Sequence, residues 1–176
     1  MALLKIGHQF PAYRLTALIG GDLSKVDAQQ PGDYFTPISS DDHPGKRRVV
    51  FFWPKDFTFV CPTEIATFGK LNDEFEDREA QILGVSIDSE FVQFQWRAQH
   101  QDLKRLPFPM LSDIKRELAQ ATGVLTQPGR GGTRAHRVRR AGVHALRPNG
   151  WRRSAQPCAA AVAHPKMTGF TEATNA

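Results

Sequence analysis

Residues 46–54, KRRVVFFWP, form an unbroken apolar run that ends at a proline, and DFTFVCPTEI, residues 56–65, follows almost at once. A run of this kind is typical of a strand that is buried on both faces. Beyond it, apolar side chains recur at intervals of three and four residues: Ile65, Phe68, Leu71 and Phe75. This spacing predicts one apolar stripe of a helix whose other side faces water. The stretch therefore predicts a strand, a short connection and an amphipathic helix.

The same alternation of strand and helix patterns continues along the chain. QILGVSID, residues 81–88, is a second apolar run of strand length. Ser89 can cap the helix that EFVQFQWRAQHQDL predicts, because a serine hydroxyl accepts a hydrogen bond from a backbone N–H of the first turn. Phe91, Phe94 and Trp96 form the apolar side of this predicted helix.

A further extended segment, LPFPMLSD at residues 106–113, contains Pro107 and Pro109. Proline lacks a backbone donor and biases the residue before it toward extended conformations, so no helix is expected here. Asp113 can cap a following helix, IKRELAQATG, for which Gly123 is the stop signal. Strands and helices of these lengths in alternation predict an α/β fold with parallel strands.

The 176 residues divide into two parts of different composition. Residues 1–125 carry 14 Lys and Arg against 17 Asp and Glu, and they hold eleven of the twelve Phe. Residues 126–176 carry eight Arg and one Lys against one Glu, and they are rich in Ala, Gly and Pro. The change falls after Leu125. We therefore expect a folded domain over residues 1–125 and a basic, disordered tail over residues 126–176.

Composition also limits the classes of function. The sequence contains no apolar run long enough to cross a membrane, and residues 1–15 lack the pattern of a signal peptide. Two cysteines are too few for a disulfide framework, which favours a reducing, cytoplasmic setting. Spaced metal-ligand pairs and phosphate-binding loops are absent from the sequence, so neither a metal nor a cofactor is expected.

Cys61 lies at the junction between the first predicted strand and its helix. Pro62 suits the first helical position, where its missing N–H costs no hydrogen bond. The free N–H groups and the dipole of a helix N-terminus stabilise a negative charge such as a thiolate. Thr58, three residues earlier, can turn its hydroxyl toward the same point. A free cysteine is commonly a small buried apolar residue, so position alone leaves a structural and a catalytic interpretation open.

The residues around this cysteine resemble the active-site segment of the peroxiredoxins, whose pattern is P-x-x-x-T-x-x-C. Pro54, Thr58 and Cys61 match that pattern position for position. The resemblance covers residues 1–125, through IGHQFPAYRLTAL, ILGVSIDSEF and LPFPMLSDIKRELAQATGVL, and is to the alkyl hydroperoxide reductase C branch, of the typical 2-Cys type. It implies a thioredoxin-like fold, in which helices flank a central mixed sheet. It also implies a thiol peroxidase that reduces hydrogen peroxide and organic hydroperoxides in antioxidant defence.

The resemblance also implies roles for single residues. Cys61 is the expected peroxidatic cysteine, which the peroxide oxidises to a sulfenic acid. Thr58 and the backbone N–H of Cys61 are the expected hydrogen-bond donors to the peroxide, and Pro54 is expected to shield the sulfur from water. Glu64 resembles the acidic residue that helps to position a catalytic arginine, although an acidic residue in a first helical turn is favourable in itself.

The resemblance further implies partners. Peroxides are the substrates, and the electron donor is a reducing redox protein: a dedicated flavoprotein reductase, thioredoxin or a similar protein. Relatives form dimers and rings of dimers, so a homo-oligomer is expected. Neither a membrane nor a specific nucleic acid is an expected partner.

The resemblance stops at ATGVL, and residues 126–176 lack the further strands, long helix and resolving-cysteine arm of the family. A switch to Arg, Ala, Gly and Pro is what a frameshift in a GC-rich gene produces, so we hypothesise that the tail is a frameshift product. Arg134 lies near the expected distance for the catalytic arginine, and Cys158 is the candidate resolving cysteine. The surroundings of both differ from the family's, which favours a chance arginine and a functionless cysteine. Loss of the last strands would leave RVVFFW, residues 48–53, as an uncovered sheet edge.

Two alternatives to an active peroxidase stay open. One is a catalytically inactive, truncated thioredoxin-like remnant. The other is non-specific nucleic-acid binding through the arginines of the tail. Peroxide consumption that depends on Cys61 would favour the enzyme, whereas DNA binding with a steep salt dependence, lost on deletion of residues 126–176, would favour the binding protein.

Overall fold

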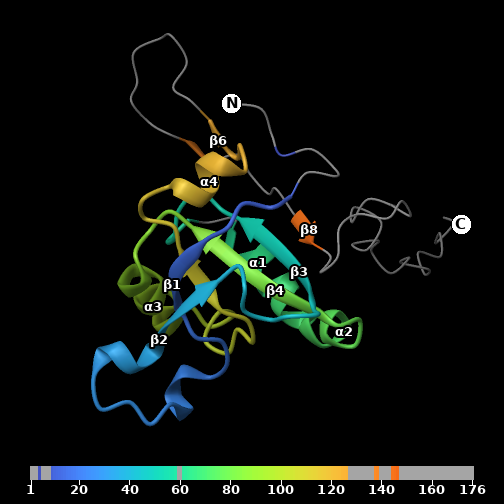
Figure 1. Cartoon of the computed structure of the whole chain (residues 1–176). Coiled ribbons are helices and arrows are strands. Elements are labelled where there is room, and N and C mark those ends of the chain that lie inside the picture. Colours follow the sequence, from blue (N-terminus) through green and yellow to red (C-terminus); the bar gives the residue numbers. More distant parts are fainter. Residues whose placement is uncertain (1–3, 5–8, 59–60, 127–136, 139–143, 147–176) are drawn as a thin grey trace, which may run out of the picture.

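A computed structural model of the chain describes Leu4 and residues 9–58, 61–126, 137–138 and 144–146. Its centre is a six-stranded mixed sheet with the strand order β2-β1-β5-β4-β3-β8 (Figure 1). The strands of this sheet are β1 (Arg14–Leu18), β2 (Phe35–Ser39), β3 (Arg47–Phe52), β4 (Ala80–Ser86), β5 (Met110–Ser112) and β8 (His144–Leu146).

The centre of the sheet is parallel. β3 pairs in parallel with β4, and β4 with β5, as the alternation of strand and helix patterns predicts. Beyond β5, β1 pairs antiparallel with β5, and β2 pairs antiparallel with β1. The carboxyl ends of β3, β4 and β5 therefore lie at one edge of the sheet, which is where open α/β folds bind their ligands.

Helices lie on both sides of the sheet (Figure 1). The single helix predicted after Cys61 is divided at Leu71, whose backbone (φ −91°, ψ 0°) departs from helical geometry. Within the described part of the chain, no helix combines the length and apolar character needed to span a bilayer. The helices are α1 (Cys61–Lys70), α2 (Asn72–Glu76), α3 (Glu90–Gln99), α4 (Glu117–Ala121) and two 3-10 helices, η1 (Leu23–Lys25) and η2 (Pro31–Tyr34).

The cap predicted at Ser89 is present, whereas the N-cap of α4 is Arg116 and Asp113 contacts the first turn of that helix from three residues before the cap. The Ser89 hydroxyl accepts a hydrogen bond from a backbone N–H in the first turn of α3 at 3.4 Å. Asp113 accepts from the backbone N–H groups of Leu118 (3.2 Å) and Ala119 (2.7 Å) in α4. This helix begins three residues later than the pattern predicts, because Arg116 has a left-handed backbone conformation (φ 63°) that does not continue a right-handed helix.

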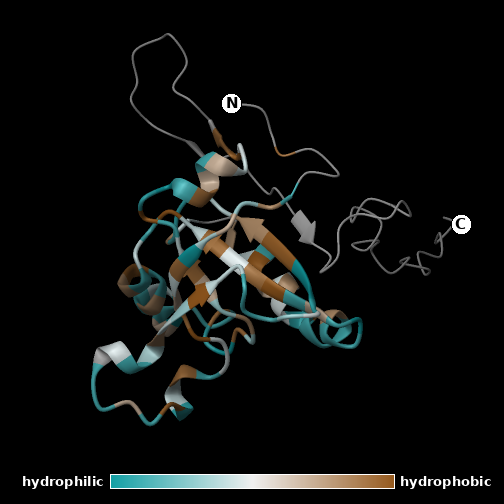
Figure 2. Cartoon of the chain, in the orientation of Figure 1, coloured by the Kyte–Doolittle hydropathy of each residue, from teal (hydrophilic) through white to brown (hydrophobic). Residues whose placement is uncertain are grey.

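Alternate residues of β3 point into two separate cores. Val50 and Phe52 belong to a buried cluster to which α4 contributes. Phe51 and Trp53 belong to a second cluster, to which α1 and α3 contribute. Figure 2 shows hydrophobic residues concentrated along the central strands. The sheet thus separates two apolar layers, as the unbroken run KRRVVFFWP predicts.

The apolar side predicted for α3 is only partly right. Trp96 is buried, whereas Phe91 is exposed, and its ring centre lies 5.0 Å from that of Phe35. Two polar side chains of the helix, Gln93 and Arg97, are fully buried, although the pattern predicted apolar residues on the buried side. The pattern missed them because it counts apolar residues, whereas a polar side chain is stable inside a protein wherever it finds hydrogen-bond partners.

The structure contradicts the prediction of an uncovered edge on β3. β8 pairs antiparallel with β3 through Arg48, Val49 and Val50, and β7 (Arg137–Val138) pairs with β6 (Leu125–Thr126). An open strand edge presents unpaired N–H and C=O groups, so any extended backbone can pair with it, whatever its side chains. Pairing of this kind does not require a hydrophobic pattern, so the sequence did not predict β7 or β8. The other residues after β6 lie outside the described residues.

Candidate active site at the N-terminus of helix α1

Cys61 is the first residue of α1, which follows β3 at the carboxyl end of the parallel strands. Pro62 occupies the second helical position, one residue later than the first position that was predicted for it. The Cys61 side chain is 5% exposed and belongs to the same buried cluster as Trp53, Ile65 and Trp96. A free thiol therefore lies at a helix N-terminus against an apolar and aromatic layer.

Thr58 lies beside the first turn of α1. Its hydroxyl donates a hydrogen bond to the backbone carbonyl oxygen of Lys55 at 3.1 Å. A hydrogen bond from Thr58 to a substrate would therefore require the hydroxyl to turn away from Lys55. Thr58 also lines an open pocket of about 370 Å³, together with Phe57, Pro62, Trp96, Gln99 and His100.

The other predicted site residues are spread over a wider part of the chain. Pro54 is half-buried in the connection between β3 and α1, and Glu64 is exposed in the first turn of α1. Arg134 and Cys158 lie outside the described residues. The structure thus brings Pro54, Thr58 and Cys61 into one short connection, and the roles of all these residues stay predictions.

Asp56 is a residue that the sequence analysis missed. It is 7% exposed, and its Oδ1 accepts a hydrogen bond from Trp53 Nε1 at 2.6 Å. Its backbone N–H donates to Asp88 Oδ2 at 2.8 Å, which ties the connection to the turn after β4. Burial raises the pKa of the Asp56 carboxyl to about 7, and the hydrogen bond from Trp53 acts against this rise. The signal in the sequence was a single acidic residue inside the apolar stretch DFTFV.

Phe57 separates Asp56 from Thr58 with an unusual backbone. Its φ of 54° is in the left-handed region, which is uncommon for an aromatic residue. The side chain is exposed, and its ring centre lies 6.1 Å from that of Trp96. The sharp turn at Phe57 lets the chain pass from a buried carboxyl to a threonine at the pocket. Strained residues of this kind cluster at functional sites.

The family of the chain follows from its similarity to known proteins. Residues 6–142 match the model of the AhpC/TSA family. The chain belongs to this family. It is 84% identical to alkyl hydroperoxide reductase C of Mycobacterium tuberculosis over 129 residues, which are 73% of this chain and 66% of that protein. Alkyl hydroperoxide reductase C of Mycolicibacterium smegmatis is 72% identical over the same shares of the two chains.

Solved structures of the family confirm the predicted fold. Mycobacterium tuberculosis AhpC superimposes with a TM-score of 0.73 and 72% identity, covering 84% of this chain and 79% of that chain. Enterococcus faecalis AhpC superimposes with a TM-score of 0.60 and 29% identity, covering 69% of this chain and 66% of that chain. The chain therefore has the thioredoxin-like fold of the peroxiredoxins, with a central mixed sheet between helices.

The likeness covers only part of these relatives. The chain spans just under two thirds of the length of the curated mycobacterial proteins that it matches. The aligned stretch of 129 residues is close in length to the predicted domain of residues 1–125, whereas the family model continues to residue 142. The boundary after Leu125 therefore stays a prediction.

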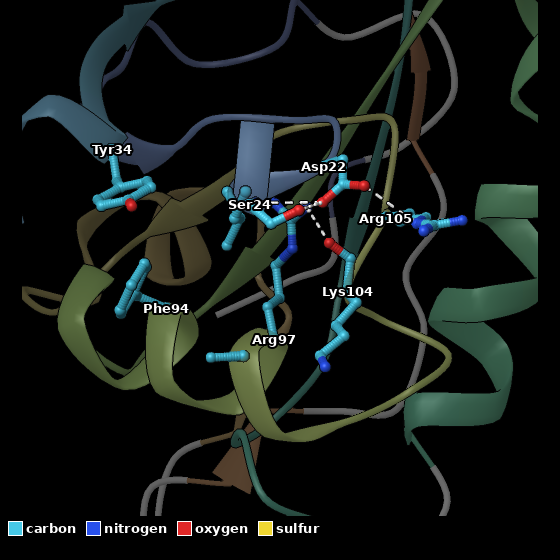
Figure 3. A pocket seen from close by; sticks show the side chains of 9 residues that line it. Asp22, Ser24, Tyr34, Phe94, Arg97, Lys104 and Arg105 are labelled. Atoms are coloured by element: carbon cyan, nitrogen blue, oxygen red, sulfur yellow. Dashed lines mark hydrogen bonds and ion pairs between the residues drawn. The ribbon is translucent and has the colours of Figure 1, made fainter. Parts of the chain in front are cut away.

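A second pocket of this AhpC/TSA-family chain, of about 350 Å³, has the buried Arg97 in its wall (Figure 3). All three guanidinium nitrogens of Arg97 donate to backbone carbonyl oxygens. The acceptors are those of Ile19 and Gly21 (both 2.5 Å), Leu103 and Leu106 (both 3.1 Å) and Lys104 (3.5 Å). Burial lowers the pKa of Arg97 to about 10, and the Asp22 carboxylate acts in the opposite direction. Arg97 thus fastens α3 to two loops, and its donors are already occupied.

Proposed function

We propose that the chain is a thiol-dependent peroxidase that reduces hydrogen peroxide and organic hydroperoxides through Cys61. The observation that carries this proposal is the free, buried thiol at the first residue of α1, directly after the connection that holds Pro54 and Thr58. Membership of the AhpC/TSA family and the names of the mycobacterial relatives support it.

The reaction begins when the thiolate sulfur of Cys61 attacks one oxygen of the peroxide. An S–O bond forms, the O–O bond breaks, and the departing oxygen takes up a proton to leave as water or an alcohol. Cys61 becomes a sulfenic acid, so the sulfur is oxidised by two electrons and the peroxide is reduced by two. A thiol then displaces water from the sulfenic acid to form a disulfide, which an external dithiol reduces.

Ionisation of the thiol explains only a small part of such a rate. A free thiol with a pKa of ~8.5 is roughly 3% ionised at neutral pH, so complete ionisation gains only about 30-fold. Enzymes typically accelerate reactions by ~10⁶-fold or more. The remainder must come from orienting the peroxide and stabilising the charge on its oxygens. Thr58 Oγ1 and the backbone N–H of Cys61 are the donors that we assign to this task, with Pro54 limiting the access of water.

The second half of the cycle depends on partners. We assign the reduction of oxidised Cys61 to an external redox protein, because the surroundings of Cys158 in the sequence, AQPCAAA, do not match a resolving-cysteine arm. The low cysteine content supports a reducing, cytoplasmic setting for this cycle. A homo-oligomer, and a supporting role for Glu64 beside a catalytic arginine, belong to the same proposal.

The sulfenic acid intermediate gives a direct test. The reduced full-length chain is treated with about one equivalent of hydrogen peroxide and a sulfenic-acid trap, and adducts are located by mass spectrometry over time. We expect fast trapping at Cys61, with Cys158 as the reference thiol in the same chain. Thr58→Val should slow trapping by roughly 10²-fold or more, as loss of one oxyanion-stabilising donor does. Thr58→Ser, which keeps the hydroxyl, should retain most of the rate.

The opposite result is equally clear. Equal labelling of Cys61 and Cys158, at the rate of free cysteine, would support the inactive remnant and overturn the peroxidase. The origin of residues 126–176 has a separate test in the coding DNA. We expect an alternative reading frame after codon 125 to encode a peroxiredoxin C-terminus, and its absence would refute the frameshift hypothesis.

A further inference from the structure

Asp56 is a buried carboxyl that the proposed reaction does not use. It lies in the connection between β3 and α1, five residues before Cys61, and it makes two contacts that fix this connection. The side chain accepts from Trp53 Nε1 at 2.6 Å, and the backbone N–H donates to Asp88 Oδ2 at 2.8 Å. The first contact anchors the connection to the end of β3, and the second anchors it to the turn between β4 and α3.

One oxygen of this carboxyl is poorly satisfied. Among the described residues, Asp56 Oδ2 is buried with no hydrogen bond of normal length, whereas Oδ1 accepts one from Trp53. An ionised carboxylate with a bare buried oxygen is costly, whereas a protonated carboxyl bears no net charge. The carboxyl therefore sits where its protonated form fits better than its ionised form.

The charged neighbour of Asp56 acts in the same sense as burial. Asp88, on the turn after β4, faces it, and its negative charge disfavours a second one. Hydrogen bonding by the Trp53 and Ser86 side chains acts in the opposite sense, and Lys55, the adjacent cation in the chain, is exposed. Burial and Asp88 together raise the pKa of Asp56 to about 7, so both protonation states are populated near neutral pH.

We propose that Asp56 is a positioning residue for Cys61: the proton of Asp56 keeps residues 53–58, which follow β3, in the conformation described, and ionisation of Asp56 loosens them. With the proton in place, the Trp53 and Asp88 contacts hold Phe57 in its left-handed conformation and Thr58 beside α1. Loss of the proton to solvent leaves a buried charge next to Asp88. The connection relieves this cost by opening to water, and the donors around Cys61 lose their alignment.

This inference rests on the proposed function only for its effect on peroxide reduction. Loosening of these residues has a consequence that needs no peroxide, because Cys61 is 5% exposed and an alkylating reagent reaches its sulfur faster when the surrounding residues open. Above neutral pH, alkylation of Cys61 should speed up while its reaction with peroxide slows. Both reactions require the thiolate, so the ratio of their rates cancels the titration of the thiol itself.

The experiment compares Asp56→Asn with the unchanged chain between about pH 5.5 and pH 8.5, a range that brackets neutral pH. Pulsed alkylation with iodoacetamide and peptide mass spectrometry give the rate at Cys61, with Cys158 as the reference thiol. We expect the ratio of alkylation to peroxide rate to rise on the order of tenfold through neutral pH, since a misplacement of 1 Å can cost roughly 10²-fold. Asp56→Asn keeps an oxygen for Trp53 but cannot ionise, so its ratio should stay flat.

Asp88→Asn provides an independent arm, in case Asp56→Asn does not fold. Removing the neighbouring charge should move the midpoint of the transition to lower pH, which a purely structural contact would not do. Identical alkylation profiles for the unchanged chain and Asp56→Asn, or an unmoved midpoint in Asp88→Asn, would overturn the proposal. If the alkylation profiles differ as expected while peroxide oxidises Cys61 and Cys158 equally, the positioning role stands and the peroxidase alone fails.

Discussion

Asp56 and Arg97 are both buried charged side chains, but their surroundings differ. Arg97 is 0% exposed, and each of its guanidinium nitrogens donates to a backbone carbonyl. Asp56 is almost as deeply buried, yet one of its carboxyl oxygens accepts no hydrogen bond of normal length from the part of the chain that the structure describes. Arg97 is a cation among carbonyl dipoles, whereas Asp56 is an acid beside a second acid, Asp88.

Because their hydrogen bonding differs, Arg97 and Asp56 have different effects on the fold. Five backbone acceptors keep Arg97 charged, and it fastens α3 to the loops at residues 19–21 and 103–106. A group satisfied in this way has little to gain from any change of state. Asp56 is incompletely satisfied and lies next to the candidate nucleophile, so a change of its charge alters the connection that carries Cys61. Two similarly buried side chains thus act differently: Arg97 is a rigid clamp that holds α3 to two loops, whereas Asp56 responds to a change of its charge.

The largest effect on stability is expected from Arg97→Met. Methionine fills a similar volume but removes all of these donors: the carbonyl oxygens of Ile19 and Gly21 lose their hydrogen bonds from Arg97, whereas those of Leu103 and Leu106 keep a backbone N–H donor. We expect the free energy of unfolding to fall by about 3–5 kcal/mol, the range seen when one partner of a buried charged interaction is removed. Urea denaturation followed by circular dichroism measures this loss. Arg97→Lys, which keeps the charge and three N–H donors, should recover part of it. A loss below about 1 kcal/mol in Arg97→Met would mean that the clamp is not what holds these loops.

A smaller, pH-dependent effect is expected from Asp56→Asn. The folded state raises the pKa of Asp56 from 3.8 to about 7, so folding favours the protonated form. The contribution of this carboxyl to stability is therefore complete below pH 4, falls as the pH rises from about 4 to about 7, and stays constant above that. Asn does not ionise, so Asp56→Asn should become more stable relative to the unchanged chain over this window, by about 2–4 kcal/mol at its upper end.

Denaturation at several pH values checks this prediction. Asp102→Asn is the matched control, because Asp102 is an exposed aspartate on the loop after α3. Its stability difference from the unchanged chain should not vary in the same window. If Asp56→Asn is instead less stable above neutral pH, the ionised carboxylate is the form that the fold prefers, and the contrast with Arg97 disappears.

The sequence predicted those parts of the fold in which each residue's role depends on its neighbours in the chain. The apolar runs of β3 and β4, the cap at Ser89 and the cysteine at the start of α1 are of this kind. The strands β1 and β2 were not predicted, since RLTAL and FTPIS have no clean alternation. Pro37 is tolerated there because β2 pairs on one side only, at the edge of the sheet.

The parts of the site that were missed depend on contacts between distant residues. DFTFV contains an acidic residue beside an apolar segment, but the group that binds its backbone N–H is Asp88, 32 residues later in the chain. Arg97 is a charged residue on a helix, which a sequence pattern assigns to solvent, and its acceptors include Ile19, 78 residues earlier. β8 pairs with β3 across about 95 residues of sequence, through Arg48, Val49 and Val50. In each case the deciding partner cannot be identified from local spacing.

The smallest effect is expected from Arg105→Ala, the closest contrast to Arg97→Met. Arg105 lies near the same pocket and pairs with Asp22 through Nε and Oδ2 at 3.1 Å, but its side chain is 82% exposed (Figure 3). Water already solvates this guanidinium, and salt screens the pair, so the ion pair gains little over the separated charges. We expect no measurable change in the midpoint of thermal unfolding at about 0.15 M salt. A clear loss of stability that disappears at high salt would show that the ion pair of Arg105 with Asp22 stabilises the fold despite its exposure. Arg105 would then contribute to stability as Arg97 does, and exposure of the side chain would no longer separate the two arginines.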